Sequence, residues 1–149
     1  MSPPGNPSDE SPDSTGPPDR QTLRLLETYL SNDALVSETR FEPNTHEPRL
    51  LRAQLKTHSY PRSVERVRLD IRWFTSGDFS VHYVETSQED IWECRWDRHP
   101  NDHNARLHFH RPPDGTEIED LSLSSTHPLD IYSIGLSAVE RRIETHWQQ

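Results

Sequence analysis

Two short runs of alternating residues constrain the fold of this chain more than any other feature. Residues 66–73 and 79–83 each alternate polar with apolar side chains, which is typical of a β-strand that buries one face. Thr75-Ser76-Gly77 lies between them, and glycine suits the last position of a three-residue hairpin loop because it tolerates a left-handed backbone. This loop makes each apolar residue face another, in the pairs Trp73–Phe79, Ile71–Val81 and Leu69–Tyr83. The sequence therefore predicts an antiparallel hairpin of defined register.

Further segments extend this hairpin into a larger sheet with a helix at each end. Leucines at positions 23, 26 and 30 follow the capping residue Asp19 and predict a helix from about residue 20 to residue 31. Strands are expected over residues 34–42, 49–56 and 90–98. Pro128 suits the start of a closing helix, whose expected apolar stripe comprises Leu129, Tyr132, Leu136, Val139, Ile143 and Trp147. We therefore expect an α+β fold, in which the N-terminal helix and the amphipathic C-terminal helix pack on one face of an antiparallel β-sheet meander.

The strand over residues 90–98 defines a polar face on the other side of the sheet. Its large residues Trp92, Cys94 and Trp96 join the apolar face. With a connecting loop centred on Ser87-Gln88, the expected pairs are Tyr83–Trp92 and Val81–Cys94. The polar rows would then be Asp70, His82 and Glu93, followed by Arg72, Ser80 and Arg95. This face is either a solvated surface with many ion pairs or a shallow site centred on His82, whose carboxylate neighbours would make it an acid–base group.

Length and composition limit the class of protein. The chain of 149 residues suggests one domain, with residues 1–19 as a disordered tail rich in Pro, Ser and Asp and residues 20–149 as a single α+β domain. No apolar run approaches the length of a membrane span. Cys94 is the single cysteine, and its place between two tryptophans predicts a buried structural thiol in a reducing compartment, here the cytoplasm.

The charged residues are distributed unusually. Lys56 is the only lysine among 16 basic residues, whereas Asp and Glu total 25 and the formal net charge is -9. An acidic, lysine-poor surface predicts a halophilic archaeal protein, and the alternative is a GC-rich genome that favours arginine codons. Such acidity argues against loose, non-specific binding of nucleic acid, so any contact with nucleic acid would have to be local and based on arginine.

The segment from residue 96 to residue 110 has a composition that a simple core does not need, because it holds four of the nine histidines. Residues 101–104 form a turn by composition, and residues 106–110 then alternate as an edge strand. Arg106, His108 and His110 share one side of that strand. If the strand folds back beside residues 90–98, His108 and His110 lie near Arg95 and Asp97 on the face that carries His82.

Three interpretations of this segment remain open. His108 and His110 could bind a metal ion together with Asp97, His99 or His103. Alternatively, the face could cleave phosphodiesters without a metal or other cofactor, which requires a base, an acid and a cation. The candidates for base and acid are His82, His108 and His110, and those for phosphate binding are Arg72, Arg95 and Arg106. Finally, the segment could belong to a protein-interaction module without catalysis.

Residues 78–110 resemble the TumE family of small toxins from prokaryotic toxin–antitoxin pairs. The motifs that carry the resemblance are Phe79-Ser80-Val81-His82, Arg95-Trp96-Asp97, His99-Pro100 and His108-Phe109-His110, followed by the acidic residues 117–120 and a closing helix. The sequence departs from the family pattern in three places: at Val81, where an aromatic residue is usual, in the loop, which lacks the family's usual run of adjacent histidines, and in its extra N-terminal helix and tail. The whole chain is also similar to a group of haloarchaeal proteins.

The resemblance implies a toxin-like protein that acts on RNA, with a cognate antitoxin that often carries a helix-turn-helix. It supplies no role for individual residues, so the predicted site depends on the sequence pattern. We predict a metal-independent ribonuclease toxin whose catalytic site comprises His82, Arg95, Asp97, His99, His108 and His110. Arg72, Arg95 and Arg106 would bind phosphate. The alternatives are an interaction module of a halophilic archaeon and a histidine-rich metal-binding domain.

Overall fold

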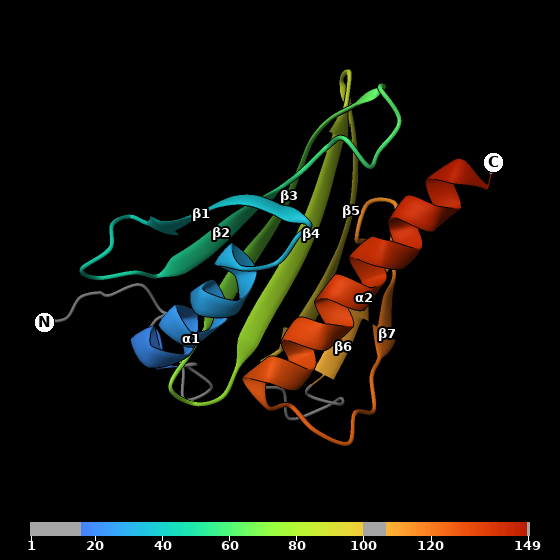
Figure 1. Cartoon of the computed structure of the whole chain (residues 1–149). Helices are drawn as coiled ribbons and strands as arrows, with labels where there is room; N and C mark the ends of the chain where they lie inside the picture. Colours follow the sequence, from blue (N-terminus) through green and yellow to red (C-terminus); the bar gives the residue numbers. More distant parts are fainter. Residues whose placement is uncertain (1–15, 100–106, 149) are drawn as a thin grey trace, which may run out of the picture.

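The computed structural model describes residues 16–99 and 107–148, which form one seven-stranded sheet and two helices (Figure 1). The elements in chain order are α1 (Arg20–Ser31), β1 (Val36–Glu42), β2 (Leu50–Leu55), β3 (Val64–Trp73), β4 (Phe79–Ser87), β5 (Asp90–Arg98), β6 (Leu107–His110), β7 (Ile118–Asp120) and α2 (Pro128–Trp147). Every strand pairs antiparallel with its neighbour in the sequence, so the sheet is a simple meander. The predicted α+β fold is confirmed.

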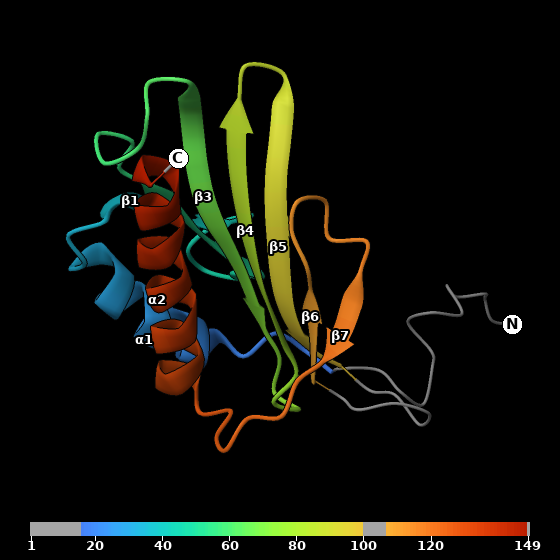
Figure 2. The same cartoon turned by 90° about the vertical axis from the view of Figure 1, so that its right-hand side faces the viewer.

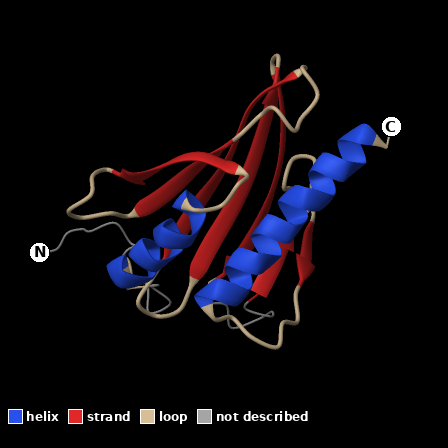
Figure 3. Ribbon diagram, in the orientation of Figure 1, coloured by secondary structure: helices blue, strands red, loops and turns tan. Residues whose placement is uncertain are grey.

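Both helices lie against the same face of the sheet, which leaves the opposite face without a helical cover (Figures 2 and 3). The Asp19 side chain caps α1 by accepting a hydrogen bond from the Thr22 amide at 3.1 Å. The three leucines that predicted this helix are its buried residues, and they pack with the apolar residues of the strands. We call the side of the sheet that neither helix covers the open face.

The hairpin of β3 and β4 has the register that the sequence predicted, including Trp73 opposite Phe79. The predicted register between β4 and β5 is wrong by two residues, since Tyr83 pairs with Cys94 and Val81 with Trp96. The reason is the turn, in which Ser87 pairs with Asp90 and Gln88 adopts a positive φ of 52°. A two-residue shift keeps every side chain on its predicted face but moves it to another row.

The shift changes the rows of the open face. His82 lies opposite Asp70 on one side and opposite Arg95, not Glu93, on the other. Ser80 lies between Arg72 and Asp97, where the sequence had placed Arg95. Each predicted row is therefore corrected at its third member.

Helix α2 begins at Pro128 as expected, but its buried face is shifted from the predicted stripe. Ile131 and Gly135 are buried with Leu136 and Val139, whereas Trp147 is 62% exposed. The Trp147 indole N–H donates to the Ser59 carbonyl at 2.8 Å, so this residue fastens the end of the helix to the β2–β3 loop without entering the core. Strand β7 was not predicted as a strand, because its three residues are all exposed and two are acidic.

The segment before α1 contacts the β3–β4 turn. The Thr75 amide donates to the Pro17 carbonyl at 2.9 Å, and the Asp19 amide donates to the Trp73 carbonyl at 2.8 Å. Residues 1–15 lie outside the described residues, and the predicted division into a tail and a domain at residue 20 stays a prediction.

Candidate functional site

Strands β2 to β6 present a continuous set of polar side chains on the open face, because alternate residues of each strand point to the same side. One row across the strands consists of Arg52, Asp70, His82, Arg95 and His110. The next row contains Arg72, Ser80, Asp97 and His108. Six of the predicted site residues, namely Arg72, His82, Arg95, Asp97, His108 and His110, therefore share this face.

Three of these residues form a tight group, which we call the Asp97 cluster: Arg95, Asp97 and His110. The Asp97 Oδ2 atom lies 2.9 Å from Arg95 Nε and 2.8 Å from His110 Nε2. Arg95 Nη2 in turn lies 3.2 Å from His110 Nε2. The Asp97 side chain is only 8% exposed, yet its Oδ1 atom accepts no hydrogen bond within residues 16–99 and 107–148. A buried carboxylate oxygen without a donor is costly, so the cluster is chemically unsatisfied at this atom.

His82 makes a second pairing of imidazole with carboxylate. Its Nε2 atom lies 2.7 Å from Glu93 Oε1, and its side chain is 27% exposed. Arg95 is the cross-strand neighbour of both His82 and His110, and its guanidinium contacts Asp97 and His110. Two strand spacings put the Cα atoms of the two histidines about 10 Å apart. The predicted position of His82 beside Glu93 is thus correct as a contact, although Glu93 lies diagonally and not in the same row.

A hollow of about 200 Å³ opens beside His82 and Arg95. Its lining comprises Leu50, Arg52, Asp70, Arg72, Ser80, His82 and Arg95. Arg72 is exposed and makes no ion pair with the part of the chain that the structure describes. Arg52 is held by Asp70, which accepts two hydrogen bonds from its guanidinium at 2.8 and 3.0 Å. The hollow therefore combines an imidazole with guanidinium groups, which suits an anionic ligand.

The other predicted site residues lie farther from this hollow. His108 is buried, its Nε2 atom is 3.6 Å from Asp120 Oδ1, and its ring centroid is 5.0 Å from that of His99. His108 and His99 thus lie next to one another beside the end of β5, and neither they nor Asp97 and His110 line the hollow. Arg106 and His103 fall outside the described residues. Among the residues that are described, no three His, Cys, Asp or Glu side chains are grouped so that they could hold a metal ion.

The sequence did not predict a second cluster, on the helical face of the sheet. We call it the Glu85 cluster: Glu85 with Tyr83, Arg142 and His146. The Glu85 carboxylate is 2% exposed and accepts hydrogen bonds from Arg142 Nε at 2.9 Å and Arg142 Nη2 at 3.0 Å. Tyr83 Oη donates to it at 2.8 Å, and His146 Nε2 lies 2.9 Å away. One sequence signal could have predicted this cluster. Glu85 continues the alternation of Phe79, Val81 and Tyr83, which places a carboxylate on the apolar face of the sheet.

Ionisable groups of the Glu85 cluster have pKa values that are shifted from their ordinary values. Burial by itself would raise the pKa of Glu85, but the hydrogen bonds from Arg142, Tyr83 and His146 hold that pKa below its ordinary value. Burial raises the pKa of Tyr83, and it also raises the pKa of Tyr60, which hydrogen-bonds to Tyr83, to about 12. At neutral pH the cluster therefore keeps an ionised carboxylate beside neutral phenols.

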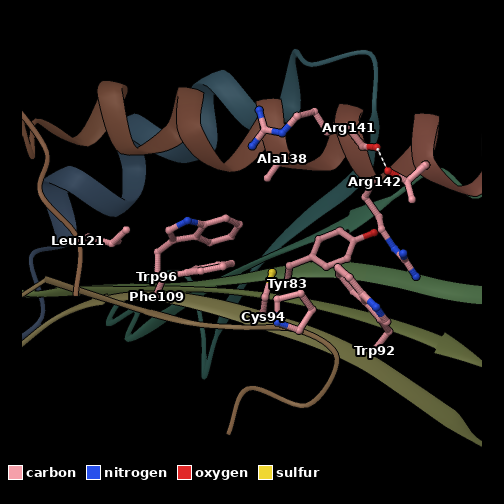
Figure 4. A pocket seen from close by; sticks show the side chains of 11 residues that line it. Tyr83, Trp92, Cys94, Trp96, Phe109, Leu121, Ala138, Arg141 and Arg142 are labelled. Atoms are coloured by element: carbon pink, nitrogen blue, oxygen red, sulfur yellow. Dashed lines mark hydrogen bonds between the residues drawn. The ribbon is translucent and has the colours of Figure 1, made fainter. Parts of the chain in front are cut away.

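A groove of about 340 Å³ lies between α2 and strands β5 and β6 (Figure 4). Trp92, Trp96 and Phe109 line its floor, and Arg141 and Arg142 border it on the helix. The Arg142 guanidinium carbon is 3.7 Å from the centre of the Trp92 ring, a cation–π contact that ties this groove to the Glu85 cluster. Cys94 is buried here, as predicted, and burial raises its pKa to about 12.

A comparison with protein families gives one result that covers most of the chain. The family model described as Toxin TumE matches residues 22–144, a range that includes all seven strands and most of both helices. Comparisons with curated proteins and with solved structures give no match. None of the helices in the described part of the chain is long and apolar enough to cross a membrane.

Proposed function

This chain belongs to the TumE toxin family, and on this premise we propose that it cleaves RNA, without a metal ion, on the open face of its sheet. As a member of the family it is a toxin-like protein of a toxin–antitoxin system, which implies an antitoxin partner. One observation carries the proposal of cleavage: His82 and His110, each paired with a carboxylate, are the two cross-strand neighbours of Arg95. These are the base, the acid and the cation that metal-free cleavage needs.

The proposed reaction uses the 2′-hydroxyl of RNA as nucleophile. Its oxygen attacks the adjacent phosphorus, the bond from phosphorus to the 5′-oxygen breaks, and the products are a 2′,3′-cyclic phosphate and a 5′-hydroxyl. We assign His82 as the base that accepts the 2′-hydroxyl proton, because it lines the hollow and Glu93 holds its Nε2 atom at 2.7 Å. We assign His110 as the acid that protonates the 5′-oxygen. Its Nε2 atom lies 2.8 Å from Asp97 Oδ2 and its Nδ1 atom 3.3 Å from the Gly115 carbonyl oxygen, so this role requires the ring to turn from these contacts toward the hollow.

Arginines supply the charge stabilisation in this proposal. Arg95 lies between the two histidines and would bind the phosphate oxygens as negative charge develops on them. Arg72, which has no ion pair within the described residues, would bind the same phosphate from the other side of the hollow. A guanidinium suits both positions because its planar fork contacts two oxygens at once. Arg106 stays a predicted phosphate ligand.

The remaining predicted residues take supporting roles. Asp97 orients His110 and Arg95 through its Oδ2 atom, whereas its Oδ1 atom is buried and has no hydrogen-bond partner within the described residues. His99 and His108 shape the edge beside Asp97 as positioning residues. We further propose that the antitoxin carries a helix-turn-helix and that the protein acts in the cytoplasm without a cofactor. The haloarchaeal origin stays a prediction from composition.

The experiment that tests this function compares purified variants on single-stranded RNA in the presence of a chelator. Replacing His82 or His110 with Ala should lower the cleavage rate by about 10²- to 10⁴-fold, because each removes one proton-transfer group. His46→Ala is the matched control, since His46 is exposed and lies outside the open face. Product analysis should show 2′,3′-cyclic phosphate ends.

Growth provides the second readout. Expression without the antitoxin should slow growth, and the combined replacement of His82, His108 and His110 with Ala should restore it. Unchanged toxicity of the triple variant would overturn the assignment. Intact RNA together with a stable complex with the antitoxin would favour the non-catalytic interaction module instead.

A further inference from the structure

A second hollow on the open face adjoins the one proposed for catalysis. It has a volume of about 190 Å³, and its lining comprises Arg52, Gln54, Arg66, Arg68, Val84 and Thr86. Arg52 lines both hollows, so the two lie next to each other on strands β2 to β4. None of the side chains that the proposed reaction requires lines this second hollow, so catalysis does not account for its arginines.

The arginines in this hollow keep hydrogen-bond donors for a ligand. Asp70 accepts two bonds from Arg52 and one, at 3.0 Å, from Arg68 Nε. A guanidinium has five N–H donors, so both side chains retain several of them. Burial would raise the pKa of Asp70, but the bonds from Arg52 and Arg68 lower it, so the carboxylate stays ionised and fixes the two cations. Arg66 is exposed and makes no ion pair within residues 16–99 and 107–148.

The charge on this part of the sheet has the opposite sign to that of the chain as a whole. On β2 to β5 the open face carries five arginines, which are Arg52, Arg66, Arg68, Arg72 and Arg95. Three carboxylates lie among these arginines, namely Asp70, Glu93 and Asp97. The flanking strands place acidic residues at the borders, with Glu38 and Glu42 on β1 and Asp120 on β7, although Glu42 is paired with Arg40. A basic strip between acidic borders thus runs across a chain of net charge -9.

We propose that the second hollow is a phosphate-binding subsite for single-stranded RNA, which holds the backbone beyond the bond that is cleaved; this rests on the proposed function. From Arg66 to Arg72 the strip extends six residues along β3, or roughly 20 Å, which accommodates several phosphates of an extended strand. From β2 to β4 it is about 10 Å wide, which suits one backbone and not a duplex. The hollow has no aromatic ring for stacking, so it binds the backbone without reading the bases.

Binding of a labelled single-stranded RNA of about twelve nucleotides tests the subsite directly. Arg66→Gln should weaken binding and reduce the slope of log K against log salt by about 0.7, because one phosphate contact is lost. The matched control is Arg141→Gln, which removes the same charge from an exposed position on α2, across the sheet. The control should bind like the unaltered protein. A duplex of the same length should bind more weakly than the single strand.

Cleavage separates this proposal from the function on which it rests. Arg66→Gln and Arg68→Gln together should lower the ratio of kcat/KM for the oligonucleotide to kcat/KM for a dinucleotide by about tenfold, since only the longer substrate reaches the subsite. If no RNA is cleaved but Arg66→Gln still weakens binding, the subsite stands and the ribonuclease function fails. If Arg66→Gln and Arg141→Gln bind alike, or if the duplex binds more tightly, the subsite is wrong even where cleavage is found.

Discussion

The sheet carries a cluster of carboxylate, arginine and histidine on each of its faces, and the two clusters differ in how completely the carboxylate is satisfied. Both oxygens of Glu85 accept hydrogen bonds, from Tyr83, Arg142 and His146. Asp97 uses only its Oδ2 atom for Arg95 and His110. The residue types are therefore the same, but within the described residues the buried Asp97 Oδ1 atom has no hydrogen-bond partner, whereas both Glu85 oxygens have one.

The Asp97 cluster and the Glu85 cluster also differ in how far their arginine side chains are exposed to solvent. The Arg142 side chain is 15% exposed, and it lies between the sheet and α2 with Trp92 against its guanidinium. The Arg95 side chain is 39% exposed on the face that no helix covers. A largely buried guanidinium that is bound to a carboxylate supports the packing of the helix, whereas one that reaches solvent can bind a substrate. The comparison teaches that residue types alone do not identify a site in this protein.

The largest expected effect is on stability. Glu85→Ala should lower the free energy of unfolding by about 3–5 kcal/mol, because it leaves the Arg142 cation buried without a partner. Asp97→Ala should cost about 1.5–3 kcal/mol, since water can solvate Arg95 once the carboxylate is gone. Urea denaturation of both variants measures the difference. An equal or larger loss for Asp97→Ala would show that the open face is as structural as the helical face.

The next largest effect is on activity. Here the substitution in the Asp97 cluster should have the larger effect and the substitution in the Glu85 cluster the smaller one. Arg95→Lys keeps the charge but loses the planar fork, and RNA cleavage should fall by about 10²- to 10³-fold. Arg142→Lys should leave the cleavage rate within about twofold when both variants are assayed below their unfolding transitions, because Arg142 faces away from the hollow. A similar loss of activity in the two variants would remove the distinction between the clusters.

The smallest effect is a dependence of stability on pH. The folded-state pKa of Glu85 lies below its ordinary value of 4.5, so the folded protein binds fewer protons there than the unfolded chain. Its contribution to stability is fully present above pH 4.5 and is lost as the pH falls through the folded-state pKa. In Glu85→Gln this part of the dependence should vanish, which thermal denaturation between neutral and acidic pH would detect. If the melting temperature of Glu85→Gln falls at acidic pH as much as that of the unaltered protein, Glu85 does not drive acid unfolding.

The sequence alone was sufficient to place side chains on faces. The period of two in residues 66–73 and 79–83, with the Gly77 loop, predicted the β3–β4 register correctly. The same period placed Arg95, Asp97, His108 and His110 on the face of His82. The leucines of α1 and the start of α2 at Pro128 also followed from local pattern and capping.

Only the tertiary structure decided which of these residues touch one another. Alternation assigns a face but is unchanged by a shift of two residues, so the β4–β5 turn was free to place Arg95, and not Glu93, opposite His82. The Glu85 cluster depends on the contacts of Glu85 with Arg142 and His146, which lie 57 and 61 positions later in the sequence. A local sequence pattern does not contain such contacts. Composition and periodicity thus determined that this chain would carry polar chemistry on a sheet. Packing decided that, within the described residues, one oxygen of Asp97 and both oxygens of Glu85 accept hydrogen bonds.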